Sequence, residues 1–210
     1  MEMGENVKPD IEYPNAAMPE TFNYEFISKR VLEVFSNKPE VWAKIRHEYA
    51  DVKRIYLAYL LELIALFVLG DLLSHLFSDG FFNAIVMSIV TYIFTCAGIY
   101  ISALLLVKLA PKFGCSVDIV SVLKLLAYTL TPVLVAGIFS FIEHLGTLIR
   151  LVAFLYTVYL LYSAISVLLD VPKEKRGVFF VLVLITILLA NIALVGILST
   201  IIIGSVVVIQ

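Results

Sequence analysis

The stretch "LKLLAYTLTPVLVAGIF", residues 123–139, is apolar enough to lie in lipid and yet contains a proline in its middle. Pro132 has no backbone N–H, so a helix here loses the hydrogen bond to the carbonyl of Tyr128 and bends. The hydroxyl of Thr131 can bond back to the carbonyl of Ala127 or Tyr128, which adds to the bend. A freed carbonyl in lipid needs a donor from a neighbouring helix. The stretch therefore predicts a kinked transmembrane helix inside a bundle.

The composition of the whole chain also indicates a membrane protein. Its 210 residues are 61% hydrophobic and 15% charged, and the mean hydropathy is +1.01. Soluble domains are about 45–50% apolar and about 25% charged, so lipid must solvate most of this surface. Cys96 and Cys115 are too few for a disulfide framework, and we expect both to be free thiols. The N-terminal residues lack the pattern of a cleaved signal peptide.

Five long apolar runs predict five transmembrane helices, because each reaches or approaches the ~20 residues that cross ~30 Å of hydrocarbon. The runs are residues 55–77, 81–107, 125–142, 151–169 and 178–197, and an apolar extension covers 198–210. The last run and its extension together are too long for one upright helix, so we expect the extension to tilt, bend or project. The predicted fold class is all-α, a polytopic five-helix transmembrane bundle over residues 55–210.

Lysine and arginine residues predict the orientation of this bundle. They precede the first run and occur in the second and fourth loops, whereas the first loop and the C-terminus have none and the third loop has only Arg150. Basic residues remain on the cytoplasmic side of a membrane. The N-terminus is therefore predicted to lie inside and the C-terminus outside.

The polar N-terminal part divides into two segments. Residues 1–24 contain three prolines and predict a flexible cytoplasmic tail. Residues 25–54 predict a cytoplasmic helical segment, in which Pro39 stands in the first turn of an amphipathic helix. Two interpretations of this helix remain open. It lies on the membrane surface with Trp42 as an interfacial anchor, or it packs on its own bundle.

Small residues form a narrow stripe along the second run, at alternating spacings of four and three. They are Ala84, Ser88, Thr91, Thr95, Gly98 and Ser102. Because small residues let helix backbones approach closely, the stripe predicts a helix-packing face and not a pore lining. Gly196, Thr200 and Gly204 repeat the pattern near the C-terminus, where a contact within the bundle and a homo-oligomer seam both remain open.

Polar side chains inside the runs are candidates for a functional site. One face of the fourth run contains Tyr156, Tyr159, Ser163, Ser166 and Asp170, and it should point into the bundle, either as interhelical hydrogen bonds or as the wall of a polar cavity. Glu62 lies about 10 Å from the inner end of the first run. A charge near mid-bilayer costs at least about 2.5 kcal/mol, so Glu62 should be protonated, paired or hydrated. The candidate intramembrane polar site is therefore Glu62, Tyr128, Thr131, Tyr156, Tyr159 and Ser163.

Motifs of catalysis are absent from the sequence. It contains no HExxH, no Ser–His arrangement and no nucleotide-binding glycine loop, so we predict no enzyme, no cofactor and no metal. Asp71 and His75 are one helical turn apart, but two ligands do not make a metal site. Nucleic-acid binding is not expected either, because the basic residues follow the membrane face.

Three segments resemble the Ypt-interacting protein (Yip) family in its short prokaryotic form. They are "FSNKPEVWAKIRHEYADVKRIYLAYLLELI", "LVKLAPKFGCSVDIVSVLKLLAYTLTPVLVAGI" with its Tyr-x-x-x-Pro element, and "LLYSAISVLLDVPKEKRGVFFVLVL", and the likeness covers residues 33–197. The chain departs from the family at Lys112, Phe113 and Gly114, where paired glycines are frequent, and it lacks the acidic-Leu-Tyr-Gly-Pro motif of the eukaryotic branch. The resemblance implies a five-span bundle in a prokaryotic cell membrane, a cytoplasmic N-terminus and no established enzymatic activity.

Two functions are compatible with these features. The first is a membrane-organising or trafficking-type scaffold that recruits a protein partner through its cytoplasmic N-terminus; eukaryotic members of the family that the chain resembles are associated with Rab-type GTPases. The alternative is a small transporter or channel that uses the polar interior around Glu62 and the Tyr156–Ser166 face. Five helices do not divide into two equal inverted halves, which removes one common transporter plan.

Overall fold

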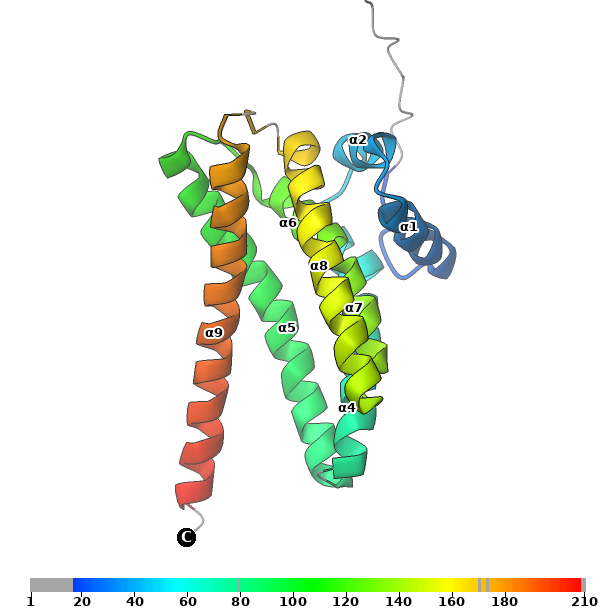
Figure 1. Cartoon of the computed structure of the whole chain (residues 1–210), viewed down its shortest axis with the longest axis vertical. Coiled ribbons are helices and arrows are strands. Elements are labelled where there is room, and N and C mark those ends of the chain that lie inside the picture. Colours follow the sequence, from blue (N-terminus) through cyan, green and yellow to red (C-terminus); the bar gives the residue numbers. More distant parts are fainter. Residues whose placement is uncertain (1–16, 79, 170, 173, 209–210) are drawn as a thin grey trace, which may run out of the picture.

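The computed structural model is a bundle of long helices with two shorter helices at one end (Figure 1). It describes residues 17–78, 80–169, 171–172 and 174–208, with the side chains of 77, 78, 191, 194, 195 and 197–208 left out. Helices are the only named elements within these ranges, and the predicted all-α class is confirmed.

Within the described residues, six α-helices and four short helical turns build the bundle. The helices are α4 (Leu61–Ser78), α5 (Phe81–Leu109), α6 (Ile119–Thr129), α7 (Thr131–Ala136), α8 (Glu143–Leu168) and α9 (Arg176–Val208). The turns are α3 (Val52–Ile55) and the π-helix η1 (Tyr56–Leu60), which lead into α4, η2 (Ala110–Phe113) after α5, and η3 (Gly137–Phe139) after α7.

Three of these segments are long and apolar enough to cross a membrane, and a fourth is added if the bent pair α6–α7 is one span. They are Val52–Leu76, Phe81–Phe113 and Glu143–Leu168, with Ile119–Thr129 plus Thr131–Phe139 as the bent pair. The chain is therefore a multi-pass membrane protein. In α9 the apolar part with described side chains is Arg176–Ala190, which is shorter than a span. The count of five predicted from the sequence is not established by these lengths.

The boundaries differ from the predicted ones in two places. Helix α8 begins at Glu143, eight residues before the predicted start at 151, because the predicted run was cut at Arg150. Helix α9 continues to Val208, so the backbone of the predicted extension 198–208 is the end of one long helix. Both differences arise because a helix continues through polar residues where its backbone remains hydrogen-bonded, whereas hydropathy marks only the apolar part.

The third span bends where the sequence predicts a bend. The axis turns by 41° between α6 and α7, at Leu130, two residues before Pro132. The Thr131 hydroxyl donates to the carbonyl of Ala127 over 3.2 Å, which is one of the two acceptors predicted for it. Thr129 likewise donates to Leu125 over 2.7 Å. The two hydroxyls compensate for backbone bonds that the bend weakens.

Helices α6 and α7 lie at the centre of the bundle. Helix α6 packs against α5 and α8, α7 packs against α4 and α8, and α9 lies mainly along α5 (Figure 1). Helix α4 approaches η3 so closely that a Cβ added at Gly70 would overlap the carbonyl oxygen of Gly137. Small residues here let two backbones touch inside the membrane.

Two helices before the bundle form a unit that we call the N-terminal cap, residues 17–51. Helix α1 (Tyr24–Ser36) starts at Asn23, whose side chain accepts from the Phe26 N–H, and ends at Asn37, which adopts the left-handed conformation at φ 46°. Asparagine tolerates that conformation better than most residues. Helix α2 (Pro39–His47) then begins with proline in its first turn, as predicted.

The predicted tail 1–24 lies outside the described residues up to position 16. Its remaining part, residues 17–24, is bonded to the rest of the cap: Met18 is buried and its N–H donates to the carbonyl of Tyr49 over 2.9 Å. Arg54 of α3 donates to the carbonyl of Met18 over 2.8 Å and pairs with Glu20 at 2.6 Å. These bonds connect the segment before α1 to the start of the first span.

The cap and two of the loops lie at one end of the bundle, whereas α9 ends at the other (Figure 1). At the cap end the loop after α5 touches the loop after α8, since Lys175 donates to the carbonyl of Gly114 over 3.3 Å. These are the loops that contain basic residues in the sequence.

Candidate functional site

The polar face of α8 is where the N-terminal cap attaches. The Tyr156 hydroxyl donates to the carbonyl of Phe35 over 2.7 Å, and the two rings stack with centroids 5.9 Å apart. The side-chain amide of Asn37 donates to the Ser163 hydroxyl over 3.2 Å. Tyr159 contacts Tyr156 ring to ring at 5.8 Å but is itself 56% exposed. Asp170, the last member of the predicted face, lies outside the described residues.

Trp42 lies inside this attachment and not on an outer surface. It is 1% exposed, and its indole N–H donates to the side-chain oxygen of Asn37 over 2.6 Å. Helix α2 packs along α8, with Ile45 also fully buried. Of the two interpretations left open by the sequence, the packed helix describes α2 in this structure, because the apolar face of the helix is covered by protein.

A buried ion pair joins α1 to the end of α2. A terminal guanidinium nitrogen (Nη2) of Arg30 donates to the carboxylate of Glu48 over 2.5 Å, and both side chains are at most 4% exposed. The carboxylate of Glu33 extends the pair. One of its oxygens lies 3.7 Å from Arg30 Nε, and the other lies 2.7 Å from Lys44 Nζ. Breaking a buried pair of this kind costs about 3–5 kcal/mol, because the remaining charge is left without compensation.

Lys124 of α6 connects this pair to the transmembrane part. Its ammonium group donates to the backbone carbonyls of Ile45, Arg46 and Glu48, at 2.9, 3.3 and 2.5 Å. These carbonyls are at the C-terminus of α2, where the last carbonyls lack helical partners and the helix dipole favours a cation. The lysine therefore fixes the end of α2 to the third span. We call Arg30, Glu48 and Lys124 the charge cluster.

An aromatic contact continues from the charge cluster to the bend. The guanidinium of Arg30 lies 5.4 Å from the ring centre of Tyr128, and that ring lies 4.8 Å from Tyr59 of η1. The Tyr59 hydroxyl shares a 2.8 Å hydrogen bond with Thr131. Because Thr131 donates its own proton to Ala127, Tyr59 is the donor here. The cap is thus in contact, through buried side chains, with the kink beside Pro132.

Burial is the main influence on the pKa of Glu48 in the charge cluster. It raises the pKa of Glu48 above its usual value, although Arg30 and Lys124 act in the opposite direction. One carboxylate oxygen of Glu48 and two guanidinium nitrogens of Arg30 have no hydrogen-bond partner among the described residues. The cluster is therefore a costly arrangement, in which removing one partner would leave an uncompensated buried charge.

The charge cluster was not among the residues singled out from the sequence. One signal could have indicated it: Lys124 stands directly before the apolar run 125–142, between Leu123 and Leu125, where a lysine at the edge of a span needs a partner. Arg30 and Glu48 gave no such signal, because charged residues in a polar segment usually face solvent.

The structure does not bring Glu62 together with the α8 face. Glu62 is half-buried on α4 and close enough to Tyr92 of α5 to interact with it electrostatically. Asp71 and His75 lie 3.8 Å apart on α4, as their spacing predicts. Among the described residues, no cluster of three His, Cys, Asp or Glu side chains could hold a metal ion.

The small-residue stripe of α5 faces the interior of the bundle. Ala84, Ser88, Gly98 and Ser102 are buried, and Thr91 and Thr95 are half-buried. Gly196 on α9 is exposed, whereas the side chains at 200 and 204 are outside the described set. Both cysteines are free thiols, as predicted.

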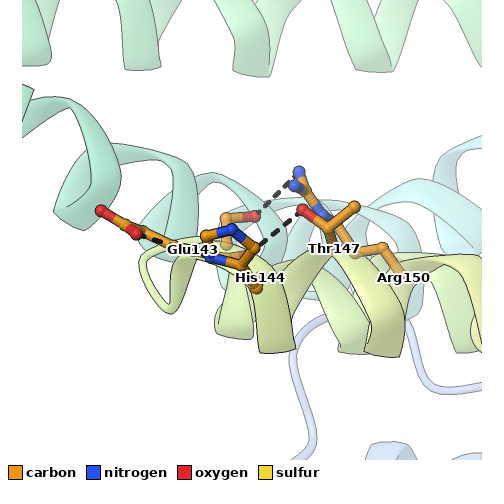
Figure 2. A pocket seen from close by; sticks show the side chains of 5 residues that line it. Glu143, His144, Thr147 and Arg150 are labelled. Atoms are coloured by element: carbon orange, nitrogen blue, oxygen red, sulfur yellow. Dashed lines mark hydrogen bonds and ion pairs between the residues drawn. The ribbon is translucent and has the colours of Figure 1, made fainter.

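A second polar group lies at the end of the bundle opposite the cap. Figure 2 shows Glu143, His144, Thr147 and Arg150 on the first turns of α8. Together with Ser140 they line an open hollow of about 400 Å³. Arg150 reaches the Ser140 hydroxyl at 3.5 Å, and Thr147 donates to the carbonyl of Glu143 over 3.2 Å. Because His144 is almost fully exposed, this group has the character of a solvated helix end.

Comparison with known protein families gives a match over most of the chain. The sequence model of the Yip1 domain matches residues 32–208, which is most of the chain and includes α2, the charge-cluster residues Glu48 and Lys124, and every helix of the bundle. No curated protein and no solved structure matches significantly.

Proposed function

The chain belongs to the Yip1 domain family, and on this basis we propose that it is a membrane-organising or trafficking-type scaffold that recruits a protein partner through its N-terminal cap. Members of this family are not known as enzymes. We therefore propose a role in binding, with no catalytic step.

The proposed arrangement in the membrane has five spans, with the cap in the cytoplasm and the C-terminus outside. It is supported by the basic residues in the two loops at the cap end and by the length of α9, which is 33 residues. Prokaryotic plasma membrane is the proposed location. Labelling of single cysteines placed at each terminus, in a Cys96→Ser/Cys115→Ser background, tests the arrangement. Termini in the same compartment would contradict it.

The attachment of the cap is the observation on which the proposed scaffold role depends. The charge cluster and the α8 contacts hold one side of α1 and α2, and their other side remains open. A hollow of about 550 Å³ lies between the two helices on that open side, with Lys29, Leu32 and Lys38 in its lining. Leu32 is 72% exposed and supplies an apolar side chain at this hollow. A fixed and partly apolar surface outside the bundle has the properties of a partner site.

The test is a change on the open side of α1 that leaves the attachment intact. We expect Leu32→Asp in the full-length protein to reduce recovery of a crosslinked partner at least about fivefold, since losing a central apolar contact costs more than about 1 kcal/mol. Glu40→Lys is the matched control, because Glu40 is exposed on α2 and does not line the hollow. Equal recovery for wild type and Leu32→Asp would exclude this surface as the partner site.

The alternative, a small transporter or channel, has less support. It requires a polar interior shared by Glu62 and the α8 face, but Tyr156 and Ser163 are bonded to the cap. Glu62 lines neither the hollow at the start of α8 nor the one beside α1. We therefore favour the scaffold.

A further inference from the structure

A cavity in the middle of the bundle is not explained by the proposed scaffold. Its volume is about 660 Å³, within the ~300–1,000 Å³ typical of small-molecule sites. It is lined by residues of every helix from α4 to α9, including Gly98, Ser102, Val133, Thr157 and Ile187. We call it the central cavity.

Two sequence features explain why the cavity exists. Helices α5 and α8 pack on α6 from different sides, and the bend before Pro132 changes the direction of α7 below them. The small residues Thr95, Gly98 and Ser102 of the α5 stripe then leave space where larger side chains would meet α8. The stripe therefore lines a cavity along part of its length, in addition to any packing role.

The cavity lies along a candidate span and opens toward the bilayer. At 1.5 Å per residue, Thr157 lies about 21 Å from the first residue of α8 and about 16 Å from its last, one residue after Tyr156, which bonds to the cap. The wall residues Phe154, Leu155 and Leu188 are more than half exposed, so the cavity opens on the surface that lipid covers, and its ligand comes from the bilayer.

The chemistry of the lining restricts the ligand further. No ionisable side chain lines the cavity in the described part of the chain, so a charged group would be buried there without compensation. Leucine, isoleucine, valine and phenylalanine side chains make up most of the wall. The ligand must therefore be neutral and mainly hydrocarbon.

One hydroxyl in the wall lacks a partner. Thr157 is only 7% exposed, and its Oγ1 makes no hydrogen bond with any described residue. Thr129, in the same cavity, already donates to the carbonyl of Leu125. Since an unpaired buried hydroxyl is costly, the ligand should supply one hydrogen-bonding oxygen at this position.

We propose that the central cavity binds a neutral lipid of the bilayer, with its hydrocarbon against the apolar wall and a carbonyl or hydroxyl oxygen hydrogen-bonded to Thr157. The cavity is formed by the bundle alone, so this site is independent of the partner surface on the cap.

The test uses full-length protein in lipid nanodiscs with two photoreactive probes. One probe is a diacylglycerol with a diazirine in its acyl chain, and the other is a phosphatidylcholine with the same chain. We expect the diacylglycerol probe to label cavity peptides of α8 more strongly. Thr157→Val should reduce this labelling about three- to tenfold, the loss of one hydrogen bond. Thr129→Val, the matched control, should stay within about twofold, because its hydroxyl is already paired.

A third variant tests whether the probe binds inside the cavity, by filling the space that the probe would occupy. Gly98→Leu places a large side chain in the cavity and should abolish labelling. Trp42 fluorescence reports whether each variant retains the attached cap; if Gly98→Leu does not fold, the Thr157 and Thr129 pair decides alone. Equal effects of Thr157→Val and Thr129→Val, equal labelling by both probes, or full labelling of folded Gly98→Leu would each overturn the proposal.

Discussion

Arg30→Met tests whether the charge cluster attaches the cap to the bundle. The substitution keeps most of the side-chain volume and removes the charge that faces Glu48 at 2.5 Å. Glu48 would then be buried without its partner, and the expected cost is about 3–5 kcal/mol of cap attachment. That is a factor of about 150 to 5,000 in the equilibrium between attached and detached cap.

The pH dependence of this cost follows from the pKa of Glu48. Burial already raises that pKa, and removing Arg30 raises it further, because a lowering influence is lost. The attached state of the variant therefore binds more protons than the detached state. The contribution of protonated Glu48 to the free energy of cap attachment is fully present below the ordinary carboxyl pKa. That contribution is lost as pH rises through the raised pKa of the attached state. We expect Arg30→Met to be closer to wild type at pH 5 than at pH 8.

Trp42 provides the assay. It is the single tryptophan of the chain and is buried against α8, so its fluorescence reports detachment of the cap directly. A urea titration in nanodiscs, followed at the Trp42 emission maximum, gives the free energy of detachment. The double variant Arg30→Met/Glu48→Leu should recover most of the loss, because replacing both members of a buried pair by apolar groups is often neutral. A loss below about 1 kcal/mol in Arg30→Met, or no recovery in the double variant, would refute the reasoning.

Three further substitutions test other parts of the structure. Asn37→Ala should weaken cap attachment by about 1–3 kcal/mol in the same titration, because alanine tolerates φ 46° poorly and the bonds to Trp42 and Ser163 are lost. Asn37→Gly should recover only the part of this loss that comes from the backbone conformation, since glycine accepts φ 46° but makes neither bond. Gly70→Val should lower the thermal midpoint of the bundle by the equivalent of about 1–3 kcal/mol, since its Cβ meets the Gly137 carbonyl, whereas Gly177→Val, where a Cβ meets nothing within 4 Å, should change it far less. Glu62→Gln should leave ion flux in liposomes unchanged, and a flux that this substitution abolished would favour a channel over a scaffold.

Several features of the fold were predictable because they depend on neighbours in the sequence. Hydropathy predicted membrane helices, Pro39 predicted the start of α2, and the Thr-Pro pair predicted the bend in the third span. Each depends on backbone hydrogen bonds and solvation within a few residues, so composition and spacing are sufficient. The start of α8 was missed by eight residues because hydropathy does not detect helical turns that contain Glu143, His144 and Arg150.

The partners of the polar residues depended on the tertiary structure. The sequence grouped Tyr156 and Ser163 with Glu62, whereas the structure joins them to Phe35 and Asn37, more than 120 positions earlier in the chain.

By itself, then, the sequence determined a multi-pass helical protein with a kinked third span. Only the tertiary structure decided that Lys124 binds the end of α2, 76 to 79 positions away, and that Arg30 and Glu48 are buried with it. The physical reason is that hydropathy and helix periodicity act locally. A buried charge is tolerated only through contacts between distant segments, and the packing of whole helices selects those contacts.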